Sequence, residues 1–261
     1  MKLSLIIAAY NQCGPLGKIF QALAQQTSQP DEILIADDGS TDGTGELIAA
    51  WSEKLSMPVR HLWQPDEGFR KLVILNRAIA AATGEYLVFT DGDCVPHRQF
   101  IADHRALAEK GFFVQGRRCF VREPFVEEFS PGKTLAWALM GKISRPSKSL
   151  RLPFPLIFRN QKQRGILGCN MAHWRDDVVA VNGFDESYQG RGMGADSDLG
   201  SRLYNLGRQR KFVYGRALVF HLDHPIAPRP HFVANRARLD EVLRSGKTRC
   251  EHGLDQHLKT P

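Results

Sequence analysis

Residues 86–93, Tyr-Leu-Val-Phe-Thr-Asp-Gly-Asp, decide how the rest of the chain is interpreted. The four residues Tyr86-Leu87-Val88-Phe89 are the pattern of a short strand buried on both faces of a parallel sheet. This strand runs directly into Thr90-Asp91-Gly92-Asp93, which brings two carboxylates to its carboxyl end. Asp-Gly is also a common pair in solvated turns. The triplet alone therefore fits a solvent-exposed turn and a ligand-binding site equally well.

The segments before this strand repeat the same organisation. Apolar runs predict strands over residues 3–9, 32–36 and 59–63, and helical apolar spacing predicts helices over 15–26 and 71–82. Between the second and third strands, Thr41 or Asp42 can cap a further helix with Leu47, Ile48 and Trp51 on its apolar face. The β-α alternation predicts an α/β fold, a doubly wound, mainly parallel sheet with helices on both faces.

Polar residues follow each of these strands, at Tyr10-Asn11, Asp37-Asp38, Asp66-Glu67 and Asp91 to Asp93. Ligands of such sheets bind outside the carboxyl ends of the strands. This location favours a site over a turn, because Mg²⁺ and Mn²⁺ prefer oxygen ligands and neutralise diphosphates. A carboxylate at 37–38 can accept the imide N–H of uracil, and Tyr10 can stack on a base. Helix capping and an ordinary core tyrosine are the alternatives.

The second half of the chain is less regular. Residues 130–165 are basic and apolar and are interrupted by prolines, so we predict a helix over 133–143 followed by a mobile loop. We also predict a helix within 166–183, another over 196–206, a strand over 217–220 and a mobile polar tail after about residue 245. The segment 130–165 fits either an anionic membrane surface or a basic lid over an acceptor.

Two motifs in this half can carry chemistry. Asp196-Ser197-Asp198 follows Gly190, Gly192 and Gly194, and one of its carboxylates can act as a general base, although a helix N-terminus explains the spacing equally well. His221 and His224 follow the last strand and are either metal ligands or surface histidines. Acidic strand ends with a late histidine form an oxygen and nitrogen site that suits Mn²⁺ or Mg²⁺ better than zinc.

The composition is that of a globular protein. The chain has 261 residues, 43% of them hydrophobic, and a formal net charge of +7. This is enough for one large core and favours anionic partners, but no nucleic-acid-binding motif is present. No apolar run approaches the length of a membrane span. The cysteines form no CxxC pair, which indicates reduced thiols in a cytosolic protein; they are Cys13, Cys94, Cys119, Cys169 and Cys250.

Several stretches resemble the inverting glycosyltransferases of family 2, which have the GT-A fold. They are SLIIAAYN (4–11), DEILIADDGSTDGT (31–44) and GEYLVFTDGDCVP (84–96). The stretch GCNMAHWRDDVVAVNGFDESYQGRGMGADSDLGSRL (168–203) is similar to the acceptor segment of galactosyltransferase-type and chondroitin-polymerase-type enzymes, and QPDEGFRKLVILNRAI (64–79) fits the same subgroup. The resemblance implies one GT-A domain over 1–245, with a nucleotide-sugar half (1–120), an acceptor half (121–245) and a tail (246–261).

The resemblance also implies roles for individual residues. The donor would be bound by residues at the strand ends and on the next helix: Ala8, Tyr10, Asp38, Arg70 or Lys71, Asn76, Asp91 and Gly92. Asp93 and His221 would hold Mn²⁺ or Mg²⁺, and Asp196 would be the catalytic base. Asn170 and Trp174 would shape the acceptor pocket. Ala195 replaces the glutamate of the family's Glu-Asp pair, and Arg191 stands in an approach that is usually rich in aromatic residues, where it can favour an acidic or phosphorylated acceptor.

We therefore expect a metal-dependent glycosyltransferase that moves a sugar from a nucleotide sugar, a UDP-sugar, to a glycan or lipid-linked acceptor. Cell-surface polysaccharide or lipopolysaccharide synthesis, in the cytoplasm or on the inner face of the cytoplasmic membrane, fits this activity. A nucleotidyltransferase is the first alternative, but the segment from Ala8 to Gln12 lacks the glycine-rich basic loop that it requires. A non-catalytic nucleotide-sugar binder, suggested by the charge and by Ala195, is the second.

Overall fold

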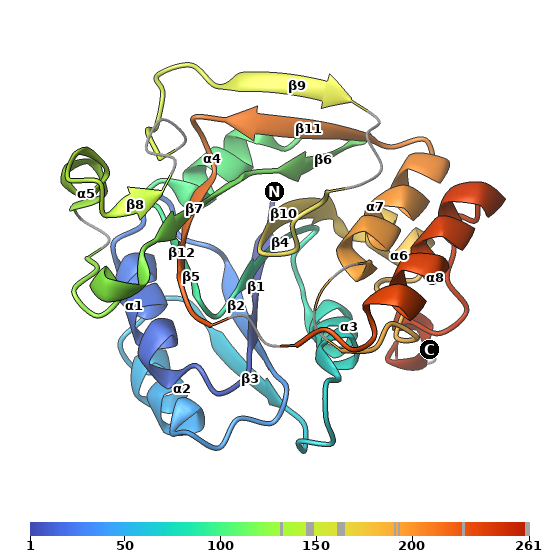
Figure 1. The fold of residues 1–261 in the computed structure, drawn as a ribbon, viewed down its shortest axis with the longest axis horizontal. Helices are drawn as coiled ribbons and strands as arrows, with labels where there is room; N and C mark the ends of the chain where they lie inside the picture. Colours follow the sequence, from blue (N-terminus) through green and yellow to red (C-terminus); the bar gives the residue numbers. More distant parts are fainter. Residues whose placement is uncertain are drawn as a thin grey trace.

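The computed structural model describes residues 1–130, 133–144, 149–160, 165–190, 192, 194–225 and 228–258. Its first half follows the predicted alternation (Figure 1). The elements are β1 (Leu3–Ala9), α1 (Cys13–Ala24), β2 (Glu32–Asp37), α2 (Thr44–Ser52), β3 (Val59–Trp63), α3 (Lys71–Ala81) and β4 (Tyr86–Asp91). The four strands are parallel and lie in the order β3-β2-β1-β4.

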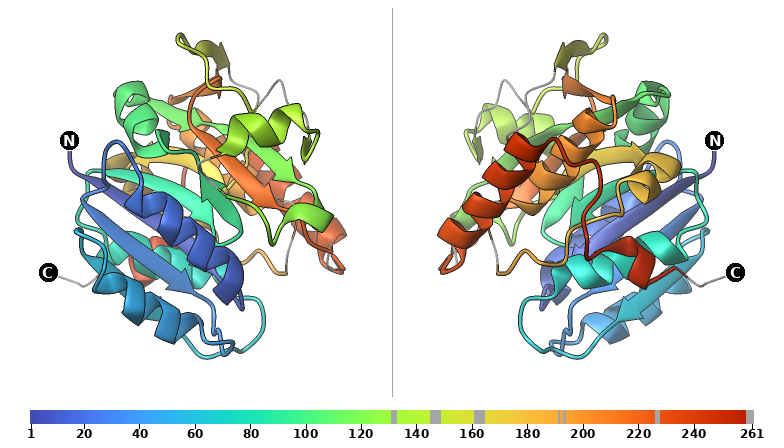
Figure 2. Two further views of the ribbon diagram at one scale, coloured as in Figure 1. Left: turned by 90° about the vertical axis from the view of Figure 1, so that its left-hand side faces the viewer. Right: turned by 90° about the vertical axis from the view of Figure 1, so that its right-hand side faces the viewer.

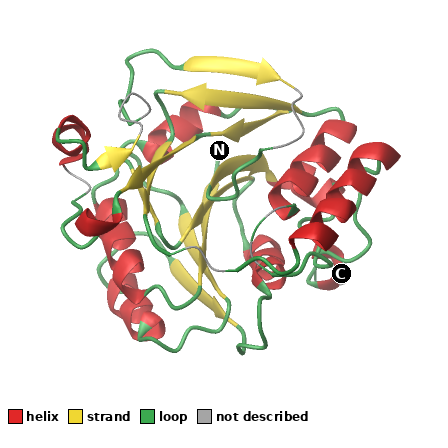
Figure 3. Ribbon diagram, viewed as in Figure 1, coloured by secondary structure: helices red, strands yellow, loops and turns green. Residues whose placement is uncertain are grey.

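Helices cover both faces of this sheet, as predicted (Figure 3). Successive residues of a strand point to opposite faces. Leu5 and Ile7 of β1 pack in the same core cluster as the apolar residues of α1 and α2. Ile6 and Ala8 pack in a second cluster, with the apolar residues of α3. The continuous apolar run of β1 is therefore explained by burial on two sides.

The large sheet continues into the second half of the chain, in the order β3-β2-β1-β4-β10-β6-β11-β9. The added strands are β6 (Phe112–Gln115), β9 (Leu156–Asn160), β10 (Asn170–Trp174) and β11 (Gln209–Tyr214). A smaller sheet has the order β5-β12-β7-β8 and consists of β5 (Cys94–Pro96), β7 (Arg117–Val121), β8 (Ile143–Ser144) and β12 (Leu218–Leu222). The small sheet brings β12 beside β5, which directly follows the Asp-Gly-Asp triplet.

The remaining helices lie around these strands. They are α4 (Phe100–Leu107), α5 (Thr134–Leu139), α6 (Arg175–Ala180), α7 (Ala195–Asn205) and α8 (Phe232–Ser245), with the short helices η1 (Glu123–Phe125) and η4 (Leu254–Gln256). Figure 2 shows α7 and α8 side by side, away from α1 and α2. The leucines of α7 share the core cluster of α3, so α7 lies on the same face of the sheet as α3.

The structure corrects several predictions for the second half. The helix predicted within 166–183 is present as the short α6, but residues 170–174 before it form strand β10, all of whose residues are buried between β4 and β6. Part of the predicted loop is edge strand β9, which pairs with β11; residues 145–148 and 161–164 of that loop lie outside the described residues. The described part of the polar tail, up to residue 258, is anchored rather than mobile, since Leu254 is fully buried in the α3 core.

The start of α2 also differs from the prediction. Its cap position is Gly43, which has a left-handed backbone and no side chain with which to cap the helix. Asp42 instead accepts hydrogen bonds from the backbone N–H groups of Cys13 and Thr44. Asp42 thus joins the beginnings of α1 and α2 beside the carboxyl ends of β1 and β2.

Candidate active site

The Asp-Gly-Asp triplet lies where β1 and β4 end together. Ala8 pairs with Asp91 in the parallel ladder, so the carboxyl ends of β1 and β4 lie side by side at the site. The Gly92 N–H donates to the Ala8 carbonyl at 2.7 Å. A Cβ at position 92 would lie 2.5 Å from Oε1 of Gln12, which is closer than atoms can approach. It would also lie 3.0 Å from the Ala8 carbonyl oxygen, so glycine suits the close approach of the two backbones. A carboxylate stands on either side of Gly92 in the sequence.

Asp93 is the centre of a polar cluster. Its Oδ1 lies 3.1 Å from Nδ1 of His221 and 3.2 Å from Sγ of Cys94, and its Oδ2 lies 3.2 Å from Nε2 of His224. Gln12 donates to Oδ2 at 3.2 Å. Burial alone would raise the pKa of Asp93, but the two histidines more than offset it and hold the pKa well below its usual range. Asp93 is therefore ionised at every physiological pH.

The cluster is suited to a metal ion. Within the described residues, the potential ligand atoms of Asp93, Cys94 and His221 all lie within 4.8 Å of one another. Asp91, Cys94 and Cys169 form a second such group. A carboxylate oxygen beside an imidazole nitrogen fits a divalent cation of the first transition series. Cys94 was not predicted as part of this site, although its position directly after Asp93 was the available signal.

A small pocket adjoins the cluster and brings together several predicted residues. It is lined by Ala8, Lys71, Leu75, Phe89, Thr90, Asp91, Gly168, Met171, Phe184 and Asp196. Lys71 from the first turn of α3 lies 2.6 Å from Oδ1 of Asp91. The hydroxyl of Thr90 is buried and has no hydrogen-bond partner in the described part of the chain. The pocket therefore offers both a cation and an unused polar group to a ligand.

Asp196 enters this pocket from the first turn of α7. Its Oδ2 accepts a hydrogen bond of 3.1 Å from the Gly168 N–H. A Cβ at Gly168 would lie 2.4 Å from Oδ1 of Asp196, so a larger residue there would displace the carboxylate from its present position. Burial raises the pKa of Asp196, while the charge of Lys71 opposes that rise. The charges of Asp91, Asp196 and Asp93 in turn outweigh burial and raise the pKa of Lys71.

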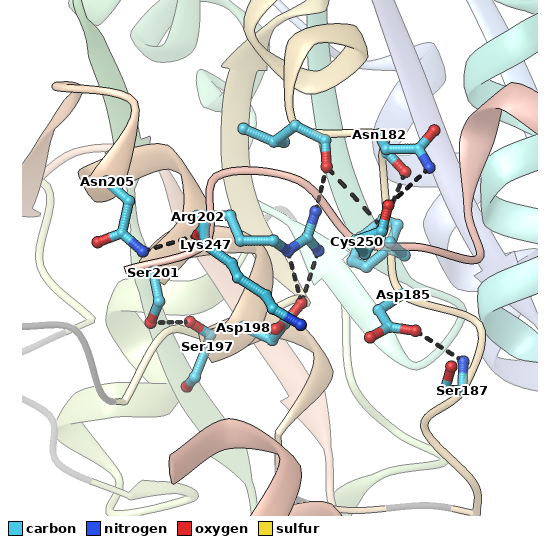
Figure 4. A network of polar contacts seen from close by, with 12 residues as sticks. Asn182, Asp185, Ser187, Ser197, Asp198, Ser201, Arg202, Asn205, Lys247 and Cys250 are labelled. Carbon is cyan, nitrogen blue, oxygen red and sulfur yellow. Dashed lines mark hydrogen bonds and ion pairs between the residues drawn. The ribbon is translucent and has the colours of Figure 1, made fainter. Parts of the chain in front are cut away.

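The opposite side of α7 is held by a buried ion pair (Figure 4). Asp198 and Arg202 are almost fully buried, and Nη2 of Arg202 lies 2.6 Å from Oδ2 of Asp198. Arg202 also donates to the Val181 carbonyl, which ends α6. Positions two apart on a helix point in nearly opposite directions. The ion pair thus fixes the rotation of α7 that turns Asp196 toward the pocket.

The ends of β1 and β2 form the other side of the site. Asp38 is buried and accepts hydrogen bonds from Nε2 of Gln64 at 2.6 Å and from the Arg70 N–H at 2.9 Å. Burial raises its pKa. The Tyr10 hydroxyl donates to Oδ2 of Asp66 at 2.9 Å. Asp38 and Tyr10 are therefore placed by neighbouring strand ends, as the sequence predicts for this edge.

The side chains of two predicted site residues, Asn76 and Asn170, are bonded inside the fold. The amide of Asn76 is fully buried and bonds Phe184 and Glu186, so it joins α3 to the segment after α6. The amide of Asn170 is equally buried and bonds three groups, the carbonyls of Arg117 and Ala217 and the ring of His104. Both side chains are used in holding the fold together.

Trp174 lies at the wrong end of the sheet for an acceptor contact. It pairs with Tyr86 at the start of β4, and its Nε1 donates to the Glu109 carbonyl. Asp91 lies five positions after Tyr86 along β4, so their Cα atoms are roughly 17 Å apart. The local pattern around Trp174 did not reveal that β10 runs antiparallel to β4. Arg191, the remaining predicted acceptor residue, lies outside the described residues.

This arrangement matches a known family. A family model described as Glycosyl transferase family 2 matches residues 4–166, more than half of the chain, including β1 to β4 and the Asp-Gly-Asp triplet. The chain belongs to this family. A second model, described as the N-terminal domain of galactosyltransferase, matches residues 150–225, which include Asp196 and His221. The two-part resemblance predicted from the sequence is thereby confirmed.

Two curated relatives show how far the similarity extends. A validoxylamine A glucosyltransferase of Streptomyces hygroscopicus subsp. limoneus is 28% identical over 227 residues, 78% of this chain and 48% of that protein. A chondroitin synthase of Escherichia coli is 22% identical over 251 residues, 85% of this chain and 35% of that protein. The chain thus spans half or less of the length of these relatives.

Solved structures of glycosyltransferases share the fold, which confirms the predicted GT-A architecture. A mannosyltransferase from Pyrobaculum calidifontis, in complex with GDP-Man and Mn²⁺, has a TM-score of 0.62 at 20% identity, covering 94% of this chain and 65% of that one. GalNAc-T7 with UDP, GalNAc and Mn²⁺ has a TM-score of 0.69 at 15% identity, covering 93% and 48%.

Proposed function

We propose that this family 2 member is a metal-dependent inverting glycosyltransferase that takes its sugar from a UDP-sugar. One observation carries the proposal: β4, β12 and α7 bring Asp91, Asp93, His221 and Asp196 to one edge of the sheet, around Lys71. Carboxylates with such different surroundings suit different tasks in one reaction. Structures with the same fold that contain GDP-Man or UDP together with Mn²⁺ support a nucleotide-sugar donor and a divalent cation.

The donor would bind across the ends of β1, β2 and β4. Asp38 would accept the uracil imide, with Tyr10 and Ala8 beside the base. Asp91 and Gly92 would lie at the ribose, and Lys71 would offer its charge to the diphosphate. Lys71 keeps that charge because its acidic neighbours raise its pKa. The Thr90 hydroxyl, buried without a partner among the described residues, is a further group for the donor.

Asp93 and His221 would hold the divalent cation, Mn²⁺ or Mg²⁺. The bound ion would supply charge neutralisation for the departing nucleoside diphosphate. Asp93 is suited to this role because its Oδ1 lies 3.1 Å from Nδ1 of His221, which places a carboxylate oxygen and an imidazole nitrogen side by side. Gln12 would orient the carboxylate by donating to Oδ2. In this assignment Asp91 contacts the nucleoside and Asp93 binds the metal, so the two carboxylates of the triplet have different roles.

Asp196 would serve as the general base. It would accept the proton of an acceptor hydroxyl while that oxygen forms a bond to the anomeric carbon, on the face opposite the bond that breaks to the diphosphate. A single displacement of this kind inverts the anomeric configuration. The raised pKa of Asp196 brings it closer to the working pH of a general base. The Gly168 N–H would orient the carboxylate.

The acceptor would be a glycan or a lipid-linked sugar, as in cell-surface polysaccharide or lipopolysaccharide synthesis, with the enzyme on the cytoplasmic side of the membrane. No helix among the described residues is long and apolar enough to span a bilayer. Apolar side chains on α5 and before β9 are nonetheless well exposed, notably Leu139, Met140 and Phe154. Such side chains beside a basic segment suit peripheral contact with anionic lipid.

The activity is tested with a panel of nucleotide sugars and Mn²⁺, measuring nucleotide release and the anomeric configuration of the product by NMR. Transfer with inversion that stops on chelation of the metal is the expected result. Binding without turnover would indicate a nucleotide-sugar binder. Release of pyrophosphate from a nucleoside triphosphate and a sugar phosphate would indicate a nucleotidyltransferase instead.

Membrane contact is tested separately, by sedimentation with phosphatidylglycerol vesicles and with phosphatidylcholine vesicles. We expect binding to the anionic vesicles only. The Leu139→Ser variant should bind them more weakly while keeping its activity on a soluble acceptor. Equal sedimentation with both lipids, or with neither, would contradict the proposed contact.

A further inference from the structure

Cys94 occupies a place that neither the predicted donor site nor the predicted base explains. It is the first residue of β5, directly after Asp93, and its side chain is fully buried. Its Sγ lies 3.2 Å from Oδ1 of Asp93 and 3.5 Å from Nδ1 of His221, and those two atoms are 3.1 Å apart. A thiol, a carboxylate and an imidazole therefore meet at one point, although His221 comes from β12.

These separations are those of ligands around one small ion. Zinc binds sulfur at about 2.3 Å and nitrogen or oxygen at about 2.0–2.2 Å, so neighbouring ligands of a tetrahedral site lie roughly 3.3–3.6 Å apart. The three measured distances are all within a few tenths of an ångström of that range. The same three residues form one of the potential metal groups found among the described residues.

We propose that Cys94 is a third protein ligand of the metal centre, so that this centre binds thiophilic ions such as Zn²⁺ and Co²⁺ more tightly than Mn²⁺. The proposal rests on the metal centre assigned above to Asp93 and His221. It changes the expected chemistry of the centre, since a thiolate favours softer ions than an oxygen and nitrogen set does. On binding, the thiol proton passes to solvent and the sulfur electron pair to the ion.

The neighbouring group of Asp91, Cys94 and Cys169 is the less suitable position for a cation. Nη1 of Arg118 lies 3.7 Å from Sγ of Cys169, which brings a permanent positive charge to that side. Asp91 is also already paired with Lys71. The direct ion pairs of Asp93 among the described residues are with His221 and His224, and Lys71 acts on it only through its charge. The charges around Cys94 therefore direct a cation toward Asp93 and His221.

Cobalt spectroscopy tests this assignment on the full chain. Co²⁺ bound by a thiolate gives an intense sulfur-to-metal charge-transfer band in the near ultraviolet. We expect the band in the wild-type protein and its loss in Cys94→Ser. The Cys250→Ser variant is a matched control, since Cys250 is a buried thiol that contacts the carbonyls of Val181 and Asn182. Cys169→Ser should also keep the band.

Competition titrations supply the second measurement. Cys94→Ser should weaken Zn²⁺ binding by at least about tenfold, the lower end of what loss of even an outer-shell partner costs, and should leave Mn²⁺ binding nearly unchanged. Co²⁺ binding without the band, a band that survives in Cys94→Ser, or equal Zn²⁺ affinity in both proteins would overturn the inference. Those results would leave Mn²⁺-dependent transfer standing. If the thiolate band appears but the protein has no transferase activity, the proposed function is wrong and Cys94 remains a metal ligand.

Discussion

The carboxylates at the end of β4 and those in the first turn of α7 are the same residue type in opposite surroundings. Asp93 is contacted by two histidines, and its pKa is lowered. Asp196 has one backbone donor, and its pKa is raised by burial. Asp93 at the strand end is thus suited to bind a cation, whereas Asp196 on the helix is suited to accept a proton.

A second contrast lies within α7 itself. Asp198, two positions beyond Asp196, is buried against Arg202 and supports the helix (Figure 4). Asp196 faces the pocket and forms no ion pair with an arginine in the described part of the chain. The comparison indicates that the carboxylate facing the pocket is acted on by Lys71 only through its charge, whereas the carboxylate that supports the helix is held in a direct ion pair.

Removing the proton acceptor should have the largest effect on activity. Asp196→Asn keeps the shape of the side chain but cannot take a proton, so we expect kcat to fall by about 10²–10⁴-fold. Donor affinity, measured by calorimetry with Mn²⁺, should change little. Full transfer activity in a correctly folded variant would show that Asp196 is not the base.

Breaking the ion pair of α7 should act on stability instead. Asp198→Ala leaves the Arg202 charge buried without its carboxylate, which costs about 3–5 kcal/mol in free energy of unfolding. Urea unfolding monitored by circular dichroism measures the loss. As the control, the double variant Asp198→Leu with Arg202→Met removes both charges and should recover most of the stability. A single variant as stable as the wild type would contradict the supporting role.

Crowding Asp196 should give an intermediate effect. The Cβ of Gly168→Ala would lie 2.4 Å from Oδ1 of Asp196 and displace the carboxylate, so we expect kcat to fall by about 10–100-fold. Gly14→Ala is the matched control, because its Cβ would meet no atom within 4 Å. Similar activity in the two variants would mean that the position of Asp196 does not limit the reaction.

The smallest effect concerns pH dependence. The base acts in its ionised form, so the rate falls as the pH drops through the pKa of Asp196. Burial places that pKa above its usual value, and Lys71 restrains the rise. Lys71→Met should therefore move the acidic limb of the kcat profile to higher pH, while Lys71→Arg should leave it nearly in place. An acidic limb at the same pH in Lys71→Met would show that the charge of Lys71 does not affect the pKa of the base.

The sequence by itself determined the first half of the fold and the identity of the edge that carries the site. Apolar runs and helical spacing are local patterns, and β1 to β4 with α1 to α3 follow them. The parallel sheet then places Asp38 and Asp91 at one edge, because parallel strands end on the same side. The glycine-rich approach to α7 offered Asp196 or Asp198 as a base, and only the resemblance to family 2 singled out Asp196, which lines the pocket.

Only the tertiary structure decided how the second half completes the site. The pattern of residues 170–174 does not predict that β10 pairs antiparallel with β4. This pairing places Trp174 beside the start of β4, at the end of the sheet away from the site, and buries Asn170. Cys94 and His221 are 127 residues apart and meet because β12 pairs with β5. Local periodicity specifies an element, whereas pairing between distant strands depends on which buried surfaces fit together.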